Sequence, residues 1–169
     1  MIQSCWQSKR SKANYKMDNT KKVYYEIEYF YPDVDRQKFW DMFFDYEAWS
    51  KSDILPGEIS IIKPGKDVPQ GAGAVRSVIS GSMNITEDIV GFRPPEYFSY
   101  TTRNGSMPVN DFGGELSFEV HKGGLLSKYK GGFNPKYFGT GWLMKYVFSR
   151  AQKSAFIGLG KAYKAYYEK

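Results

Sequence analysis

The sequence has too few cysteine and histidine residues for a disulfide framework or a zinc site. Its 169 residues include one cysteine, Cys5, and one histidine, His121. A single cysteine cannot form an internal disulfide, and these two residues supply too few ligands for a zinc cage. The glycine-rich stretch 71–76 lacks the third glycine of a dinucleotide loop and leads into a strand pattern, not a helix. We therefore expect neither a metal nor a cofactor.

Long hydrophobic runs are also missing. No apolar stretch approaches the roughly 18 residues of a membrane-spanning helix, and the first residues lack the apolar core of a secretory signal. The composition, 41% hydrophobic and 25% charged, still allows a packed core, and the length suits one domain. These features predict a soluble, cytoplasmic, single-domain protein.

The net charge of +6 is concentrated at the two ends of the chain. Residues 1–16 contribute +4 and residues 140–169 contribute +5, which leaves −3 for the middle. Basic charge outside the strand region argues against nucleic-acid binding. We predict a flexible basic leader at 1–16 and a single domain at 17–169. The basic ends are either solvated surfaces or sites of transient contact with acidic membranes.

The first part of the domain predicts a strand and two short helices. Residues 23–31 alternate between two faces, as a half-buried strand does. Asp35 is placed to cap a helix over residues 36–46, and a second short helix or turn is expected around Trp49.

Residues 58–134 contain only strand and turn signals. Asn104 and Gly105 form a typical hairpin-turn pair, and the glycine pairs at 113–114 and 131–132 suit sharp bends in a sheet. Together with the first strand the pattern predicts seven antiparallel strands, the later six at 59–63, 74–80, 83–92, 97–103, 111–121 and 125–133.

The end of the chain predicts a long helix over residues 140–168. The middle of its apolar side is made of small residues, Ala151, Ala155, Gly158 and Ala162. A helix that closes a core more often has leucine or isoleucine there. Such a side allows either very close packing on the sheet or a space between the helix and the sheet.

Aromatic residues are the main excess, at 18% of the chain. They either fill the core or line a hydrophobic ligand pocket, in which tyrosine hydroxyls would orient a ligand. Glu87 and Asp88 are neighbours on one strand and therefore point to opposite faces, so one of them is either an inward carboxylate or a charge at the rim.

Several segments in order resemble the polyketide cyclase/dehydrase and lipid-transport superfamily (SRPBCC), which includes START-related domains and the birch-pollen-allergen fold. The similarity spans residues 23–167 and is carried by VDRQKFWDMFFDYEAWSK, IIKPG, GAGAVRSV, ITEDIVGFRPPEYFSY, DFGGELSFE and FNPKYFGTGWLMKYVFSRA. It implies an α+β helix-grip fold, in which a curved antiparallel sheet wraps around the terminal helix. It also implies an apolar or amphipathic small molecule held between the helix and the sheet. Some members catalyse reactions there, but the family shares no universal catalytic motif.

These observations give one leading hypothesis and one alternative for the space beneath the helix, besides the membrane-surface or partner-docking role that the basic ends of the chain allow. The first is a carrier, a monomer or weak dimer, that binds a lipid, isoprenoid or polyketide-like molecule. The alternative is a cyclase- or dehydratase-type enzyme with acid–base candidates Glu87, Arg76, Tyr100 and Tyr129. The expected ligand-binding residues are Phe43, Phe98, Tyr100, Leu116, Phe118, Tyr129, Phe148, Ala151, Ala155 and Leu159.

Overall fold

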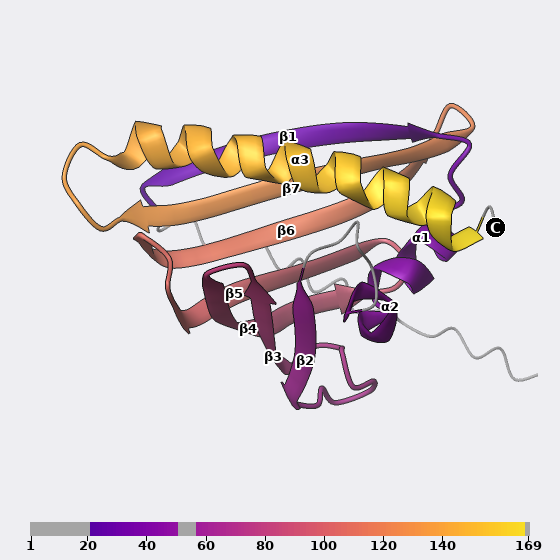
Figure 1. Ribbon diagram of the computed structural model, residues 1–169, viewed down its shortest axis with the longest axis horizontal. Coiled ribbons are helices and arrows are strands. Elements are labelled where there is room, and N and C mark those ends of the chain that lie inside the picture. Colours follow the sequence, from indigo (N-terminus) through magenta and orange to yellow (C-terminus); the bar gives the residue numbers. More distant parts are fainter. Residues whose placement is uncertain (1–20, 51–56, 168–169) are drawn as a thin grey trace, which may run out of the picture.

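The computed structural model describes residues 21–50 and 57–167 (Figure 1). The leader predicted at 1–16 lies outside these residues. In chain order the elements are β1 (Val23–Pro32), α1 (Arg36–Phe43), α2 (Tyr46–Ser50), β2 (Glu58–Lys63), β3 (Val75–Ser80), β4 (Met83–Arg93), β5 (Tyr97–Gly105), β6 (Val109–His121), β7 (Gly124–Pro135) and α3 (Gly141–Tyr167).

All seven strands form one antiparallel sheet in the order β1-β7-β6-β5-β4-β3-β2. The long helix α3 lies along one face of this curved sheet, and α1 and α2 lie near the end of the sheet where α3 finishes (Figure 1). This arrangement confirms the α+β helix-grip fold with two short helices after the first strand.

The first strand and the first helix form for the reasons that the sequence suggests. On β1, Tyr25 and Ile27 are buried whereas Glu26 and Glu28 are exposed, so the alternation separates a core face from a solvent face. At the start of α1, the Asp35 carboxylate accepts a hydrogen bond of 2.8 Å from the Lys38 backbone N–H. This bond satisfies a donor that has no partner within the helix.

The second short helix expected around Trp49 is present as α2, but the first helix, predicted over residues 36–46, is wrong in its extent because it ends three residues earlier. α1 ends at Phe43, and α2 begins at Tyr46. Between them, the Asp45 carboxylate accepts a hydrogen bond of 3.0 Å from the Ala48 backbone N–H. Because the Asp45 side chain bonds to the backbone at the start of α2, it favours the end of α1 over its continuation.

The hairpin turn predicted at Asn104 and Gly105 is also wrong, because both residues belong to β5. Their backbones pair with β4, opposite Thr86 and Ile85, after the pairing of β5 with β6 has ended at Thr101. The connection to β6 follows at residues 106–108. Since β4 extends beyond the β5–β6 ladder, it satisfies backbone groups that a tight turn would otherwise leave unpaired.

The glycine pairs at 113–114 and 131–132 face each other on β6 and β7. In the same row, Tyr25 lies opposite Gly131 and Tyr100 lies opposite Gly114. A Cβ atom at Gly114 would lie 2.6 Å from the hydroxyl oxygen of Tyr129. The missing side chains therefore leave room for tyrosine rings on the face of the sheet that packs toward α3.

No helix among residues 21–50 and 57–167 is long and apolar enough to cross a membrane.

Candidate ligand-binding cavity between the terminal helix and the sheet

Beneath α1 the space on the sheet is filled by aromatic side chains. Phe39 and Phe118 are almost completely buried, with ring centroids 5.5 Å apart. Trp40 meets Phe118 edge to face at 5.8 Å, and Phe43 lies 5.5 Å from Phe98. We call this cluster the aromatic core; it comprises Phe39, Trp40, Phe43, Phe44, Phe92, Phe98 and Phe118.

Beside the aromatic core, a cavity of about 380 Å³ lies between α3 and the sheet. Its wall on the helix side includes Phe148, Ala151, Ala155 and Leu159. The remaining lining residues come from the sheet, α1, α2, the connection between β5 and β6, and one further position on α3: Tyr25, Phe43, Trp49, Ile59, Arg76, Val78, Ser80, Met83, Ile85, Glu87, Phe98, Tyr100, Met107, Phe112, Leu116, Tyr129 and Gln152.

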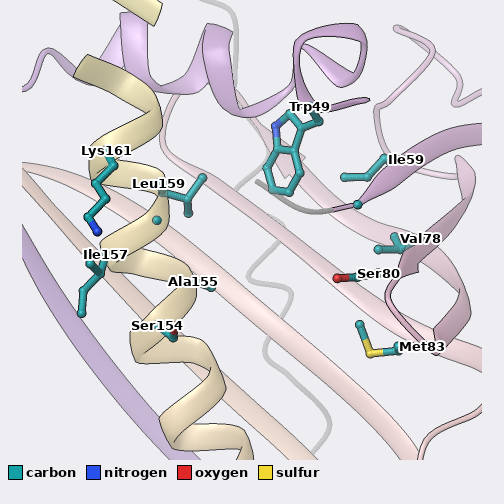
Figure 2. Close-up of a pocket in the computed structure, with 12 residues that line it drawn as sticks. Trp49, Ile59, Val78, Ser80, Met83, Ser154, Ala155, Ile157, Leu159 and Lys161 are labelled. Atoms are coloured by element: carbon teal, nitrogen blue, oxygen red, sulfur yellow. The ribbon is translucent and has the colours of Figure 1, made fainter. Parts of the chain in front are cut away.

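A second hollow, the outer cleft, has a volume of about 670 Å³ and shares part of its lining with the cavity. Figure 2 shows that Ala155 and Leu159 of α3 face Val78 of β3 and Met83 of β4 across a gap, with Trp49 at one end. Because the cavity and the outer cleft have these residues in common, they form one continuous groove with an opening beside α3.

The apolar stripe expected on the terminal helix is rotated in the structure. The buried residues of α3 are Phe156, Leu159, Ala162 and Tyr163, whereas Ala155 is exposed. Phe156 and Tyr163 pack on the sheet and α1, and the Tyr31 hydroxyl donates to the Phe156 carbonyl at 2.9 Å. The large residues thus hold the helix against β1. The small residues at 151, 155 and 158 border the groove. Of the two arrangements that the sequence allowed, close packing or a space between the helix and the sheet, the structure has the space.

One polar group in the cavity wall is a buried ion pair. Arg76 Nε lies 2.7 Å from Glu87 Oε2, and both side chains are less than a tenth exposed. Arg76 Nη1 also donates to the Tyr46 hydroxyl at 3.1 Å. Burial acts to lower the pKa of Arg76, but the charge of Glu87 and the hydrogen bonds outweigh it and raise that pKa above its usual value. The guanidinium therefore remains charged.

Glu87 is thus the inward carboxylate of the two neighbours on β4. Asp88 faces the other side of the sheet, where it accepts two hydrogen bonds from Arg103 at 2.8 and 2.9 Å. The expectation of opposite faces is confirmed.

The second polar group is a set of three tyrosine hydroxyls. The hydroxyl oxygens of Tyr100 and Tyr129 are 3.1 Å apart, and Tyr129 is also hydrogen-bonded to Tyr25. Burial raises the pKa of Tyr25 from 10.0 to about 12, although the bond to Tyr129 offsets part of the rise. Burial also raises the pKa of Tyr100 and Tyr129. At neutral pH all three hydroxyls are protonated and act as hydrogen-bond donors or acceptors.

The structure brings nine of the ten expected ligand-binding residues to the cavity wall. Phe118 is the exception, because it is 1% exposed within the aromatic core and does not reach the cavity. Binding by the nine remains a prediction. All four acid–base candidates also line the cavity, but Glu87 is paired with Arg76, and the hydroxyls of Tyr100 and Tyr129 are paired with each other.

Sequence reasoning missed the residues at the far wall of the groove. Trp49, Ile59, Val78 and Met83 line both the cavity and the outer cleft. The alternation on β3 could have singled out Val78, but the position of Trp49 depends on how α2 packs against the sheet. Among the described residues, no group of three or more histidine, cysteine, aspartate or glutamate side chains could hold a metal ion.

Comparison with known proteins shows the fold. No protein-family model and no curated protein sequence matches the chain. Among solved structures, Ara h 8.0201 has a TM-score of 0.64 at 18% identity, covering 85% of this chain and 95% of its own. The protein XoxI from Bacillus cereus has a TM-score of 0.64 at 15% identity, covering 83% of this chain and 95% of its own. A START superfamily protein from Mycobacterium smegmatis has a TM-score of 0.66 at 11% identity, covering 85% of this chain and 97% of its own.

At these identities the likeness establishes the architecture. The chain has the helix-grip fold that these structures share, the one that the sequence resemblance implied.

Proposed function

We propose that the protein binds a hydrophobic or amphipathic small molecule in the groove between α3 and the sheet. The observation that supports this most directly is the cavity of about 380 Å³, whose wall is mainly aromatic and aliphatic and which continues into the outer cleft. Apolar pockets with few polar groups are typical of small-molecule sites. The resemblance to lipid-binding START-related domains favours the same function.

The groove opens beside α3, so water reaches its apolar walls when no ligand is bound. A bound molecule that covers these walls removes apolar surface from water, which favours binding by about 25 cal/mol for each Å² covered. The apolar lining therefore supports an apolar ligand.

The polar groups in the wall favour a ligand with at least one oxygen acceptor. The indole nitrogen of Trp49 is buried and has no hydrogen-bond partner among the described residues. The hydroxyls of Tyr100 and Tyr129 contribute further donors at the sheet side. A lipid, isoprenoid or polyketide-like molecule with a carbonyl or hydroxyl group has this combination.

Native mass spectrometry of freshly purified protein tests for a co-purified molecule, and anilinonaphthalene sulfonate fluorescence measures access to the groove. Ala155→Trp places a large ring between the cavity and the outer cleft, so we expect the dye affinity to fall about tenfold, which corresponds to about 1.4 kcal/mol. Ala165→Trp is the matched control, because Ala165 is exposed on the same helix and lines neither hollow.

Equal dye affinities in the two variants would contradict binding in the groove. A wild-type protein that carries no guest and binds no dye would contradict the proposal altogether.

A cyclase- or dehydratase-type reaction in the same cavity is the second candidate, favoured by the buried Glu87 carboxylate and tyrosine hydroxyls. Protonated tyrosines can donate to a developing enolate, while Glu87 would first have to exchange its bond to Arg76 for a substrate proton. The test is deuterium exchange at the carbon between the carbonyls of a β-diketone, followed by NMR for wild type and Tyr100→Phe. An exchange rate equal to that in buffer would remove this candidate.

Three further expectations accompany the carrier proposal: a cytoplasmic location, a monomeric or weakly dimeric state, and transient contact with acidic membranes. Their support comes from the sequence, and the last is developed below.

A further inference from the structure

The start of α3 and the loop before it expose a cluster of large apolar side chains. Phe138 is fully exposed, and Trp142 is 74% exposed. Such side chains are normally scattered singly over a protein surface. We call this cluster the aromatic surface; it comprises Tyr137, Phe138, Trp142, Leu143, Tyr146 and Val147.

The four members of the aromatic surface that belong to α3 occupy the side of the helix that faces away from the sheet. Trp142 and Tyr146 are one turn apart, as are Leu143 and Val147, so the four side chains share one side of the helix. Phe148, which packs on the sheet, lies on the opposite side. The loop that carries Phe138 extends past the end of the sheet (Figure 1). The aromatic surface is thus placed to meet a large, flat partner.

The segment that carries the aromatic surface is positively charged. Between residues 136 and 167 the chain has six basic residues and no acidic residue. Arg150 and Lys153 are exposed one and two turns beyond Tyr146, on the same side of α3. This side of the helix therefore combines apolar rings with cations, the two components that bind an anionic, partly apolar interface.

We propose that the aromatic surface docks on the anionic surface of a lipid bilayer. Tryptophan and tyrosine have apolar rings and a polar edge, which suits the headgroup region. Phe138, at the tip of the loop, enters the boundary between headgroups and acyl chains. Arg150 and Lys153 are attracted to the negative lipids, as basic residues beside an inserted apolar face generally are.

Two other partners fit the same side of the helix less well. A second copy of the chain would bring two equally basic surfaces together, and like charges oppose that contact. Single-stranded nucleic acid would match the rings and cations, but Leu143 and Val147 offer no face on which a base could stack. An anionic bilayer accommodates both the charge and the aliphatic residues.

The docked helix would hold the groove close to the membrane. Ser154, Ile157 and Lys161, on the following turns of α3, line the outer cleft. An apolar ligand could then pass between the bilayer and the groove with little exposure to water. Docking itself does not require the proposed ligand function, so either can fail alone.

Vesicle flotation of the full chain tests the proposal, with vesicles of phosphatidylcholine alone and of phosphatidylcholine mixed with phosphatidylserine. We expect binding to the anionic vesicles only, weakening as salt is added. The double variant Phe138→Ser/Trp142→Ser should bind at least about tenfold more weakly. Its control is Ile62→Ser/Val120→Ser, which removes two side chains exposed by 60% and 69% on β2 and β6.

A charge test separates this surface from the basic residues elsewhere. Arg150→Glu/Lys153→Glu should weaken binding about tenfold or more, since each basic residue near an anionic surface contributes appreciably. Lys63→Glu/Lys66→Glu changes the net charge equally at exposed positions off α3 and should have a much smaller effect.

Three results would overturn the proposal. The first is the absence of binding to anionic vesicles, and the second is binding that both serine variants weaken equally. The third is a wild-type dimer, or a complex with single-stranded RNA, that Phe138→Ser/Trp142→Ser disrupts while vesicle binding is unchanged. Circular dichroism of each variant confirms that the fold is retained.

Discussion

The two ends of the space between the helices and the sheet are built differently. Beneath α1, seven aromatic side chains pack ring against ring, and only two of them, Phe43 and Phe98, also border the cavity. Beneath the middle of α3, Ala151 and Ala155 face the sheet across the groove. Trp49 stands between the two regions, with its ring edge to face on Phe43 at 5.6 Å. The aromatic excess therefore serves two purposes, filling one end and lining the other.

The two regions therefore have different roles. The aromatic core supplies the packing that stabilises the fold, which allows the groove to remain open. Residues that line the groove should then contribute less to stability than equally large residues of the core, and variants can test this.

The largest expected effect is on the aromatic core. Phe39→Ala should lower the free energy of unfolding by about 4 kcal/mol, because it leaves a cavity among fully packed rings. Phe148→Ala, at the half-buried wall of the groove, should cost about half as much. Urea denaturation of both variants measures the difference. Equal losses would mean that the groove wall is as tightly packed as the core.

The next effect compares two neighbouring carboxylates. Glu87→Gln leaves the buried Arg76 charge without its counter-ion and should cost about 3 kcal/mol. Asp88→Asn breaks a more exposed pair with Arg103 and should cost less than about 1 kcal/mol. Denaturation at neutral pH measures both values. A small loss for Glu87→Gln would indicate that water reaches Arg76 inside the groove.

A third effect, no larger than that of Glu87→Gln, appears only at alkaline pH. The pKa of Tyr25 is raised to about 12 in the folded state, against 10.0 for the ordinary side chain. The unfolded chain therefore ionises first, and stability that is complete below pH 10 is lost as the pH rises toward 12, by about 3 kcal/mol. Unfolding free energies across this range should fall less steeply in Tyr25→Phe. Identical slopes would show that the Tyr25 hydroxyl is solvated in the groove.

Local patterns were enough to predict most of the fold. The period-two alternation of β1, the Asp35 cap and the long final helix depend on interactions within a few residues, and each appears in the structure. Asn104 and Gly105 failed as a hairpin turn because a distant strand, β4, competed for their backbone groups. The end of the first helix was predicted too late for a local reason. Asp45 caps α2, and α1 therefore ends before it.

The candidate site was predictable in part. Strand parity placed Tyr100, Leu116 and Tyr129 on the inner face, and they line the cavity. Phe118 has the same parity, but it lies deeper, under α1, where the aromatic core covers it. The alternation determines which face a side chain is on and cannot determine how far along a curved sheet the hollow extends.

By itself, the order of alternating, helical and turn-forming segments determined the elements and the sheet, because these depend on backbone hydrogen bonding and on separating apolar from polar faces. Only the tertiary structure decided that α3 rests on Phe156 and Tyr163 and turns its small residues toward the groove. That rotation results from packing between residues far apart in the chain, where the volumes of all the facing side chains act together.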